Sequence, residues 1–256
     1  MAWFRGDCHT HSARSSGGEL TPAQVVAAAR EFGLDFLAAT EHGTDENFAD
    51  WAATGFPVLR GRENITPDGH WLDIEGRLRV VAHPHAPYPG GTFTLPPDGF
   101  DLVEVWNGAW RSDVPWQADN EAALAGWLLD PLTRPAVGDS DIHRAGQIGV
   151  AHTVVRADRC TPGAILDGLA AGRSWITDSA STELTFEARR GDHVAQIGDT
   201  LPPGDGEPEL TVDVRGVPGA RVELHRTDAY ALVEVRHPDG RMAALTNAIR
   251  LSETRG

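Results

Sequence analysis

The sequence predicts a mixed α/β chain, with an incomplete, distorted barrel followed by a small antiparallel β module. Up to about residue 178, strand-like and helix-like segments alternate with short connections, which is typical of parallel βαβ units. After about residue 180, short alternating runs are separated by turns rich in Gly, Pro and Asp, which is typical of antiparallel β-structure. We therefore expect a first domain over residues 1–180 and a β-sandwich-like module over residues 181–256.

The elements of the first domain follow from local signals. In the first helix Thr21 is the expected N-cap, Pro22 the first helical residue and Gly33 the left-handed stop. The predicted strands cover residues 2–7, 34–40, 57–65, 78–82, 102–106, 135–137 and 149–155. The predicted helices cover residues 23–32, 46–53, 115–129 and 162–171. These elements are too few for an eight-fold barrel, and residues 65–78 leave room for a hairpin but not for a crossover helix.

In the C-terminal module the predicted strands cover residues 184–188, 210–214, 221–224, 231–235 and 242–245. The module carries no catalytic cluster. It could pack on the barrel, supply a dimer edge or overhang the active site, and the sequence leaves these roles open.

The composition excludes several classes of function. With 37 acidic and 22 basic residues the formal net charge is −15, so we expect no nucleic-acid partner. All the basic residues are Arg, which excludes a P-loop lysine, a Schiff-base lysine and pyridoxal-phosphate chemistry. Cys8 and Cys160 form no disulfide framework. There is neither a signal-peptide-like start nor an apolar run of membrane length, so we expect a cytoplasmic protein without a membrane partner.

Histidines and acids recur where the predicted strands end. Residues at i and i+2 of a strand face the same side, so the pair His9 and His11 forms half of a metal site. Further candidates are Glu41, His42, Glu63, His83, His85, Asp139, Asp141 and His143. The C-terminal ends of strands are where α/β proteins place their chemistry, and imidazole plus carboxylate ligands suit Mn, Fe or Zn. By contrast, we interpret His152, His193, His225 and His237 as surface or packing residues.

The ordered motifs resemble those of the PHP superfamily, named for polymerase and histidinol phosphatase domains. The phrases that carry the resemblance are GDCHTHS, AATEHGT, GRENIT with DGH, VAHPHAP, VEVWNGAW and GDSDIH, and they look like the carbaryl-hydrolase-like branch. The resemblance runs from Asp7 to about Thr177. It implies a distorted, incomplete (β/α)7 barrel that holds two divalent transition metals, with a third metal left open.

The resemblance also implies roles for single residues. The first metal would take His9, His11, Glu63 and Asp141. Glu63 would bridge to a second metal that also takes His83, whereas His42 and His143 would hold a third. Asp7 would orient a ligand histidine, and we expect His85 in a similar supporting place.

Two departures from the family pattern matter. An acid usually follows the His-x-His pair in a Ser-Asp-Gly phrase, but here residues 15–18 read SSGG, and Glu19 is displaced. The third metal therefore lacks its acid. Family members usually carry a histidine ligand about ten residues after the bridging Glu. Here either His70 or Asp73 could fill this role, and we prefer His70.

We expect a metal-dependent hydrolase that acts on a small-molecule phosphoester through a metal-activated hydroxide. One alternative is a carboxylic or carbamic ester or amide hydrolase, and another is a domain that binds metal or ligand without turnover. Candidate substrate-binding residues are Arg144, Arg111 and Arg14, which lie in the motif loops, together with Asn107 and Trp106. The oligomeric state is left open.

Overall fold

The computed structural model describes residues 1–111 and 117–252. The strands of the first two thirds of the chain are β1 (Ala2–Thr10), β2 (Phe36–Ala39), β3 (Val58–Thr66), β4 (Gly69–Ile74), β5 (Leu78–Ala82), β6 (Leu102–Asn107), β7 (Ala136–Asp139), β8 (His152–Ala157) and β9 (Ser174–Thr177). The remaining strands are β10 (Glu183–Arg190), β11 (His193–Gln196), β12 (Thr200–Leu201), β13 (Glu209–Arg215), β14 (Arg221–Arg226), β15 (Tyr230–Arg236), β16 (Met242–Thr246) and β17 (Ile249–Leu251).

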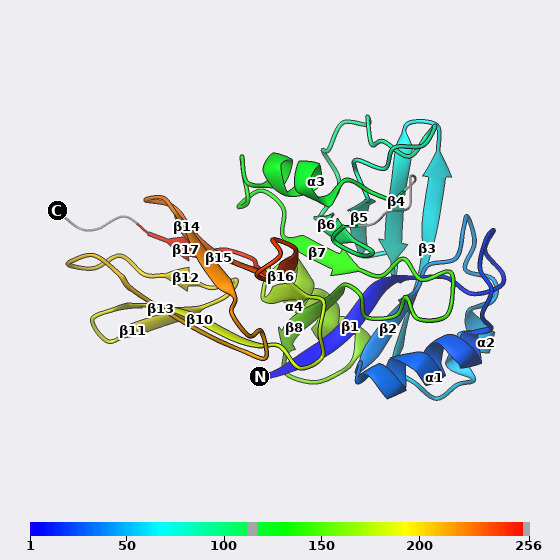
Figure 1. Cartoon of the computed structure of the whole chain (residues 1–256), viewed down its shortest axis with the longest axis horizontal. Coiled ribbons are helices and arrows are strands. Elements are labelled where there is room, and N and C mark those ends of the chain that lie inside the picture. The colour runs from blue at the N-terminus through cyan, green and yellow to red at the C-terminus, as the bar shows by residue number, and fades with distance from the viewer. Residues whose placement is uncertain (112–116, 253–256) are drawn as a thin grey trace.

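Most of the strands form one large, curled sheet (Figure 1). Its order is β12-β17-β15-β16-β9-β8-β1-β2-β3-β4-β5-β6-β7, with β14 paired to β15. The sheet curls far enough that β7 contacts β1, β8 and β9. The α/β class is therefore confirmed, whereas the distorted, incomplete (β/α)7 barrel stays a prediction.

The strands that lead to the candidate site run in the same direction. β1, β2 and β3 pair in parallel, and so do β5, β6 and β7. Between these two groups β4 pairs antiparallel with both β3 and β5, so a hairpin replaces the missing crossover helix as the sequence indicates. The C-terminal ends of the parallel strands consequently meet at one edge of the curled sheet.

The helices of the described residues are α1 (Pro22–Phe32), α2 (Phe48–Ala52), α3 (Asn120–Trp127) and α4 (Pro162–Ala170). The predicted start of the first helix is confirmed, because the Thr21 side chain accepts a hydrogen bond from the Gln24 backbone N–H. Its end is confirmed as well, since Gly33 has a φ of 97° in the left-handed region. Of the predicted helix over residues 115–129, the first two residues lie outside the described part of the chain.

The C-terminal strands continue the large sheet through the pairing of β16 with β9. β11, β10 and β13 form a separate antiparallel sheet beside them (Figure 1). Side chains from both halves share one buried cluster, which includes Trp106, Trp127, Ile176, Leu232, Met242 and Leu245. The side chain of Asn247 also bonds both backbone groups of Ala136. These contacts fix the start of β7, and the division of the chain near residue 180 stays a prediction.

Candidate metal centre

A dense group of acids and histidines lies at the C-terminal edge of the curled sheet. β1 carries His9, and His11 follows directly after the strand. β3 contributes Glu63, whereas His83 follows β5 and Asp141 follows β7. Most of these side chains are buried, with exposed fractions between 0% and 3% for His9, His11, Glu63 and His83. The structure thus brings together five residues that are scattered over 130 positions of the sequence.

Glu63 is the centre of this group. Its Oε2 atom lies close to three imidazole nitrogens, namely Nε2 of His9 (3.6 Å), of His11 (3.5 Å) and of His42 (3.3 Å). Its Oε1 atom lies 2.8 Å from Nδ1 of His70 and 3.1 Å from Nε2 of His83. The two oxygens of one carboxylate therefore face two different sets of histidines, which is the geometry that a bridging ligand requires.

Asp141 completes the first set. Its Oδ1 atom lies 3.1 Å from Nε2 of His11 and 3.5 Å from Nε2 of His9. The ligand atoms of His9, His11 and Glu63 all lie within 4.8 Å of one another, and so do those of His9, His83 and Asp141. Such spacings leave room for a divalent cation between the donors.

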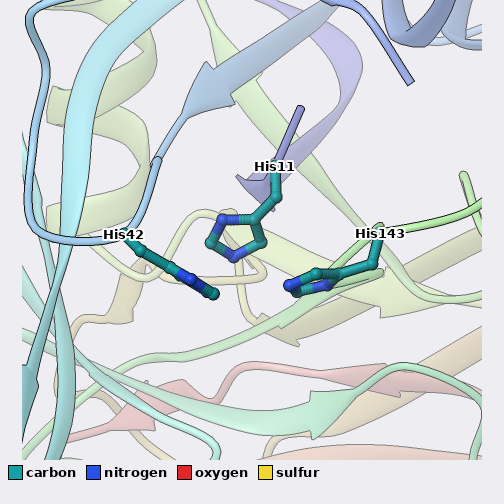
Figure 2. A group of neighbouring side chains, drawn as sticks. All are labelled: His11, His42 and His143. Carbon is teal, nitrogen blue, oxygen red and sulfur yellow. The ribbon is translucent and has the colours of Figure 1, made fainter. Parts of the chain in front are cut away.

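His11, His42 and His143 form a third group (Figure 2). Their ring centroids are 4.5 Å apart for His11 and His42, 4.5 Å for His11 and His143, and 5.5 Å for His42 and His143. Figure 2 shows the three rings directed toward a common space from three separate segments. This group lacks an acid of its own, as the SSGG phrase predicts, and it borders Glu63 Oε2 and Asp141 Oδ1.

The donors fit a divalent metal because buried nitrogens are left without a partner. The Nδ1 atom of His9 lies 2.7 Å from Glu104 Oε1, so the ring donates its proton there. Nε2 of His9 and Nε2 of His11 are buried and have no hydrogen-bond partner among the described residues, although each faces two carboxylates. A divalent cation would satisfy these nitrogens and the carboxylate oxygens that surround them.

Electrostatics keep the two central acids charged. Burial opposes ionisation of Asp141, but His9 and His11 outweigh it and lower the pKa of Asp141. In the same way His9, His42, His70 and His83 overcome burial and hold the pKa of Glu63 well below its usual value. Glu104, Asp141 and Glu63 raise the pKa of His9 despite burial, whereas burial and the neighbouring His9 lower the pKa of His11 to about 4.

Two residues of the centre hold an unusual backbone conformation. His83 has a φ of 27° and Asp141 a φ of 50°, both in the left-handed region that non-glycine residues rarely adopt. Each such residue costs about 1–3 kcal/mol, and strain of this kind collects at functional sites. The fold therefore maintains a locally unfavourable backbone at two of the candidate ligands.

Of the remaining residues that the sequence predicts to support the centre, some lie in it and others do not. His70 lies in the centre, whereas Asp73 points to Arg62 with a separation of 3.9 Å between Oδ2 and Nη2. Asp7 holds the backbone, because its Oδ1 atom accepts from the N–H groups of His9 (3.3 Å) and Ser140 (3.1 Å). His85 is exposed, and no described hydrogen bond joins its ring to the centre.

The centre opens into a cavity of about 500 Å³. Asn107 and Arg144 line it, as expected, together with Tyr88 and Gln147. Trp106 is fully buried instead and packs in the core, where its Nε1 donates to the Gly108 carbonyl. Arg14 and Arg111 do not line the cavity, since Arg14 pairs with Asp50 and Arg111 with Glu121.

Sequence reasoning missed several polar residues around the ligands. Glu104 accepts from the His9 ring, from the His83 backbone N–H (2.8 Å) and from the Asn107 amide (3.1 Å). Ser15 contacts His11, and the Tyr88 hydroxyl lies 3.5 Å from His83 Nδ1. A charged residue inside the apolar run LVEVW was the available signal for Glu104, because buried acids need partners.

A further group of donors lies on the C-terminal hairpin, where Glu223, His225 and Glu234 approach one another. Its two more buried members already have partners, because Glu234 accepts from His225 Nε2 at 3.1 Å and from Arg236 Nε. We therefore interpret this group as an ion-pair cluster on the surface.

Comparisons with known proteins agree with the fold. Residues 122–174 match the family model described as PHP-associated. Over 99% of its length the chain is similar in structure to 84% of a two-domain protein from Bacteroides vulgatus that contains a predicted PHP-like metal-dependent phosphoesterase, with a TM-score of 0.56 and 15% identity. These findings support the expected relation to the PHP superfamily, whereas the carbaryl-hydrolase-like branch stays a prediction. No curated protein matches the sequence.

Two other solved structures are similar to part of the chain. PsfC from Pseudomonas syringae has a TM-score of 0.49 and 18% identity, over 70% of this chain and 93% of PsfC. Endonuclease Q, solved with a 27-mer duplex substrate whose abasic lesion lies at the active site, has a TM-score of 0.46 and 14% identity, over 67% of this chain and 56% of its own.

The Endonuclease Q complex overturns one expectation. The net charge of −15 led us to exclude nucleic acid as a partner. Endonuclease Q was solved with a duplex substrate, so the exclusion of nucleic acid does not stand. Net charge averages over the whole surface, whereas binding depends on the local field around the site. Among the described residues, no helix is long and apolar enough to cross a membrane.

Proposed function

We propose that this chain is a metal-dependent hydrolase, and that its substrate is a small-molecule phosphoester. One observation carries the proposal: buried imidazole nitrogens without partners face the carboxylates of Glu63 and Asp141 where a cavity opens. A structural relative described as containing a predicted PHP-like metal-dependent phosphoesterase supports the reaction class.

In this proposal His9, His11, Glu63 and Asp141 would hold a first metal. Glu63, His70 and His83 would hold a second, and His42 and His143 would hold a weaker third beside His11. Bound divalent metals supply Lewis-acid polarisation of the scissile group and lower the pKa of water. The negative charge of the Glu63 carboxylate would offset the repulsion between two such cations.

The other groups of the cavity would bind and orient the substrate. Asn107 is fixed by Glu104 and lies 3.4 Å from Asp141 Oδ2, so its amide has a defined direction. Arg144 supplies a positive charge at the cavity wall and pairs with Glu19 at 3.3 Å. A phosphate group would compete with Glu19 for this guanidinium.

A second candidate function is hydrolysis of a neutral carboxylic or carbamic ester. The observation that favours it is the scarcity of cations, because Arg144 is the sole Arg among the described residues that line the cavity. Its side chain is 62% exposed and already paired with an acid. A neutral ester would need no such charge.

The test is a panel of substrates with protein loaded with Mn²⁺ or Zn²⁺. It includes p-nitrophenyl phosphate, nucleotides, p-nitrophenyl acetate, aryl carbamates and a DNA duplex with an abasic site. The proposal expects hydrolysis of the small phosphoesters by the wild type and none by Glu63→Gln. Turnover of acetate or carbamate alone would favour the second candidate, and cleavage of the duplex alone would replace the small molecule by DNA. Metal binding without any turnover would contradict an enzyme.

A matched pair of arginine variants separates the two ester classes. Arg144→Ala is expected to lower phosphoesterase activity about 10-fold or more, because it removes a donor to the developing charge. The control is Arg14→Ala, since Arg14 is comparably exposed at 66% but does not line the cavity. An equal loss with both variants, or no loss with Arg144→Ala, would exclude a role for Arg144 in binding phosphate.

A further inference from the structure

Ser15 is a buried hydroxyl at which three hydrogen bonds of the centre meet. It is 5% exposed and does not line the cavity. Its Oγ atom lies 2.5 Å from Glu41 Oε2, 2.9 Å from the His42 backbone nitrogen and 3.0 Å from His11 Nδ1. The hydroxyl thus contacts two of the three histidines of Figure 2 and a buried acid.

The Ser15 hydroxyl has a single proton, and this determines which nitrogen of the His11 ring is protonated. A serine hydroxyl has one proton to donate and two lone pairs that accept. The proton goes to the Glu41 carboxylate, and the His42 N–H donates to one lone pair. Only the second lone pair is left for His11, so His11 Nδ1 must carry a proton and donate it. A neutral His11 ring then has its free lone pair on Nε2, which faces Glu63 and Asp141.

Glu41 is itself held firmly in place. Its carboxylate accepts from the backbone and side chain of Ser12, from Ser15, from the Asn47 amide and from the Trp51 indole. Asn47 occupies the N-cap position of α2 and the fully buried Trp51 lies within the helix, so both donors come from this one element. Five donors on one carboxylate leave it little freedom to rotate.

We propose that Ser15 and Glu41 are positioning residues that hold His11 in the Nε2-ligating tautomer and fix the backbone of His42. The inference rests on the proposed metal centre. Glu104 orients His9 directly, whereas Glu41 orients His11 through an intervening serine. Because one hydroxyl contacts both His11 and His42, the first and third groups of ligands are assembled together.

The test combines metal titration with NMR. Titration of the metal-free protein with Zn²⁺ is compared for wild type, Ser15→Ala, Glu41→Gln and the control Ser16→Ala, whose position is exposed. We expect Ser15→Ala to weaken binding about 10–100-fold for the ligand set that includes His11, which is the usual effect of losing a group that orients a ligand. Ser16→Ala should bind as the wild type does.

Long-range ¹⁵N–¹H spectra of the histidine rings provide a readout that does not depend on activity. The wild type should show His11 with its proton on Nδ1, and Ser15→Ala should show this signal weakened or moved to the other tautomer. Glu41→Gln keeps the shape of the acid and serves if Ser15→Ala does not fold. A His11 ring that keeps its Nδ1 proton in both variants, or unchanged Zn²⁺ affinity, would overturn the proposal. Absence of Zn²⁺ binding by the wild type would contradict the metal centre instead. The tautomer of His11 in the wild type would still test whether Ser15 and Glu41 orient this ring.

Discussion

Histidines lie next to acids both at the edge of the curled sheet and in the C-terminal strands, but the two regions differ in whether the histidine nitrogens are hydrogen-bonded. In the C-terminal part His225 pairs with Glu234 at 3.1 Å, and His237 pairs with Asp178 at 2.8 Å. At the sheet edge, Nε2 of His9 and of His11 each faces two carboxylates and has no hydrogen-bond partner in the described part of the chain. One region has an acid for each of these histidines, whereas the other has imidazole nitrogens to which no described residue gives a hydrogen bond.

This difference shows which observation defines a site. A histidine next to an acid is common. Where the two form a hydrogen bond, both groups are satisfied and no metal ion is needed. Buried nitrogens that face several carboxylates without a bond are costly unless a cation lies among them. The unsatisfied atoms, rather than the residue types, distinguish the candidate metal centre from the ion pairs of the C-terminal strands.

The largest expected effect comes from Glu63→Gln. The substitution keeps the shape of the side chain but removes the charge that allows two cations to lie close together. We expect the loss of at least one metal per chain and a fall in turnover of about 10³-fold or more. Elemental analysis and hydrolysis assays measure both quantities. Wild-type metal content together with wild-type turnover would exclude Glu63 as the bridging ligand.

Glu104→Gln should have a smaller effect on the same centre. Glu104 accepts hydrogen bonds from the His9 ring, the His83 backbone and Asn107, and an amide can accept at only one of its two positions. We expect metal affinity to fall about 10–100-fold while the fold is retained. Competition with a fluorescent chelator measures this change, and an unchanged affinity would show that His9 needs no orienting acid.

His152 is a buried histidine in which both ring nitrogens have hydrogen-bond partners. Its Nδ1 atom lies 3.2 Å from the Gly149 carbonyl, and its Nε2 lies 3.1 Å from Arg5 Nη1. Burial lowers its pKa from 6.5 to about 3, with a further contribution from Arg5. Below pH 6.5 the unfolded chain therefore binds the proton that the folded chain rejects, and stability falls as the pH falls.

The predicted size of this effect is about 2 kcal/mol between pH 6.5 and pH 5. Urea unfolding at several pH values measures it by comparing the wild type with His152→Gln, which cannot titrate. The variant should lose stability less steeply over this range, whatever its stability at neutral pH. Parallel pH profiles for both proteins would show that His152 is not held neutral in the folded state.

The smallest effect is expected at the surface group of the C-terminal hairpin. His225→Gln removes one member of the group formed by Glu223, His225 and Glu234. Because Glu234 keeps its contact with Arg236, we expect metal content and turnover to equal those of the wild type. A drop in bound metal would mean that completed hydrogen bonds do not exclude a site and would break the comparison.

The sequence predicted much of the centre and less of its surroundings. Strand ends with His-x-His, Glu-His and Asp-x-His are local signals, so the candidate ligands could be named before the fold was known. Glu104, Ser15 and Tyr88 could not, because what matters is their contact with His9, His11 and His83 across the sheet. Trp106 was expected to line the pocket together with Asn107, but it is fully buried, because adjacent residues of a strand face opposite sides.

For the fold as well, the elements with local sequence signals were predicted and those without them were missed. Apolar alternation located nearly every long strand, and the cap at Thr21 located α1. The short strand β9 was missed, as was its pairing with β16, which joins the C-terminal strands to the large sheet. Strand pairing over 60 residues leaves no local signal, since it depends on packing between distant segments.

The central claim is that the unsatisfied donors at the sheet edge hold divalent metal ions. The most direct test is elemental analysis of the wild-type protein purified without chelators. We predict about two transition metal ions per chain, with a third position filled only weakly because the SSGG phrase supplies no acid. A protein that contains no transition metal, and takes up none when supplied with Mn²⁺, Fe²⁺ or Zn²⁺, would contradict the claim.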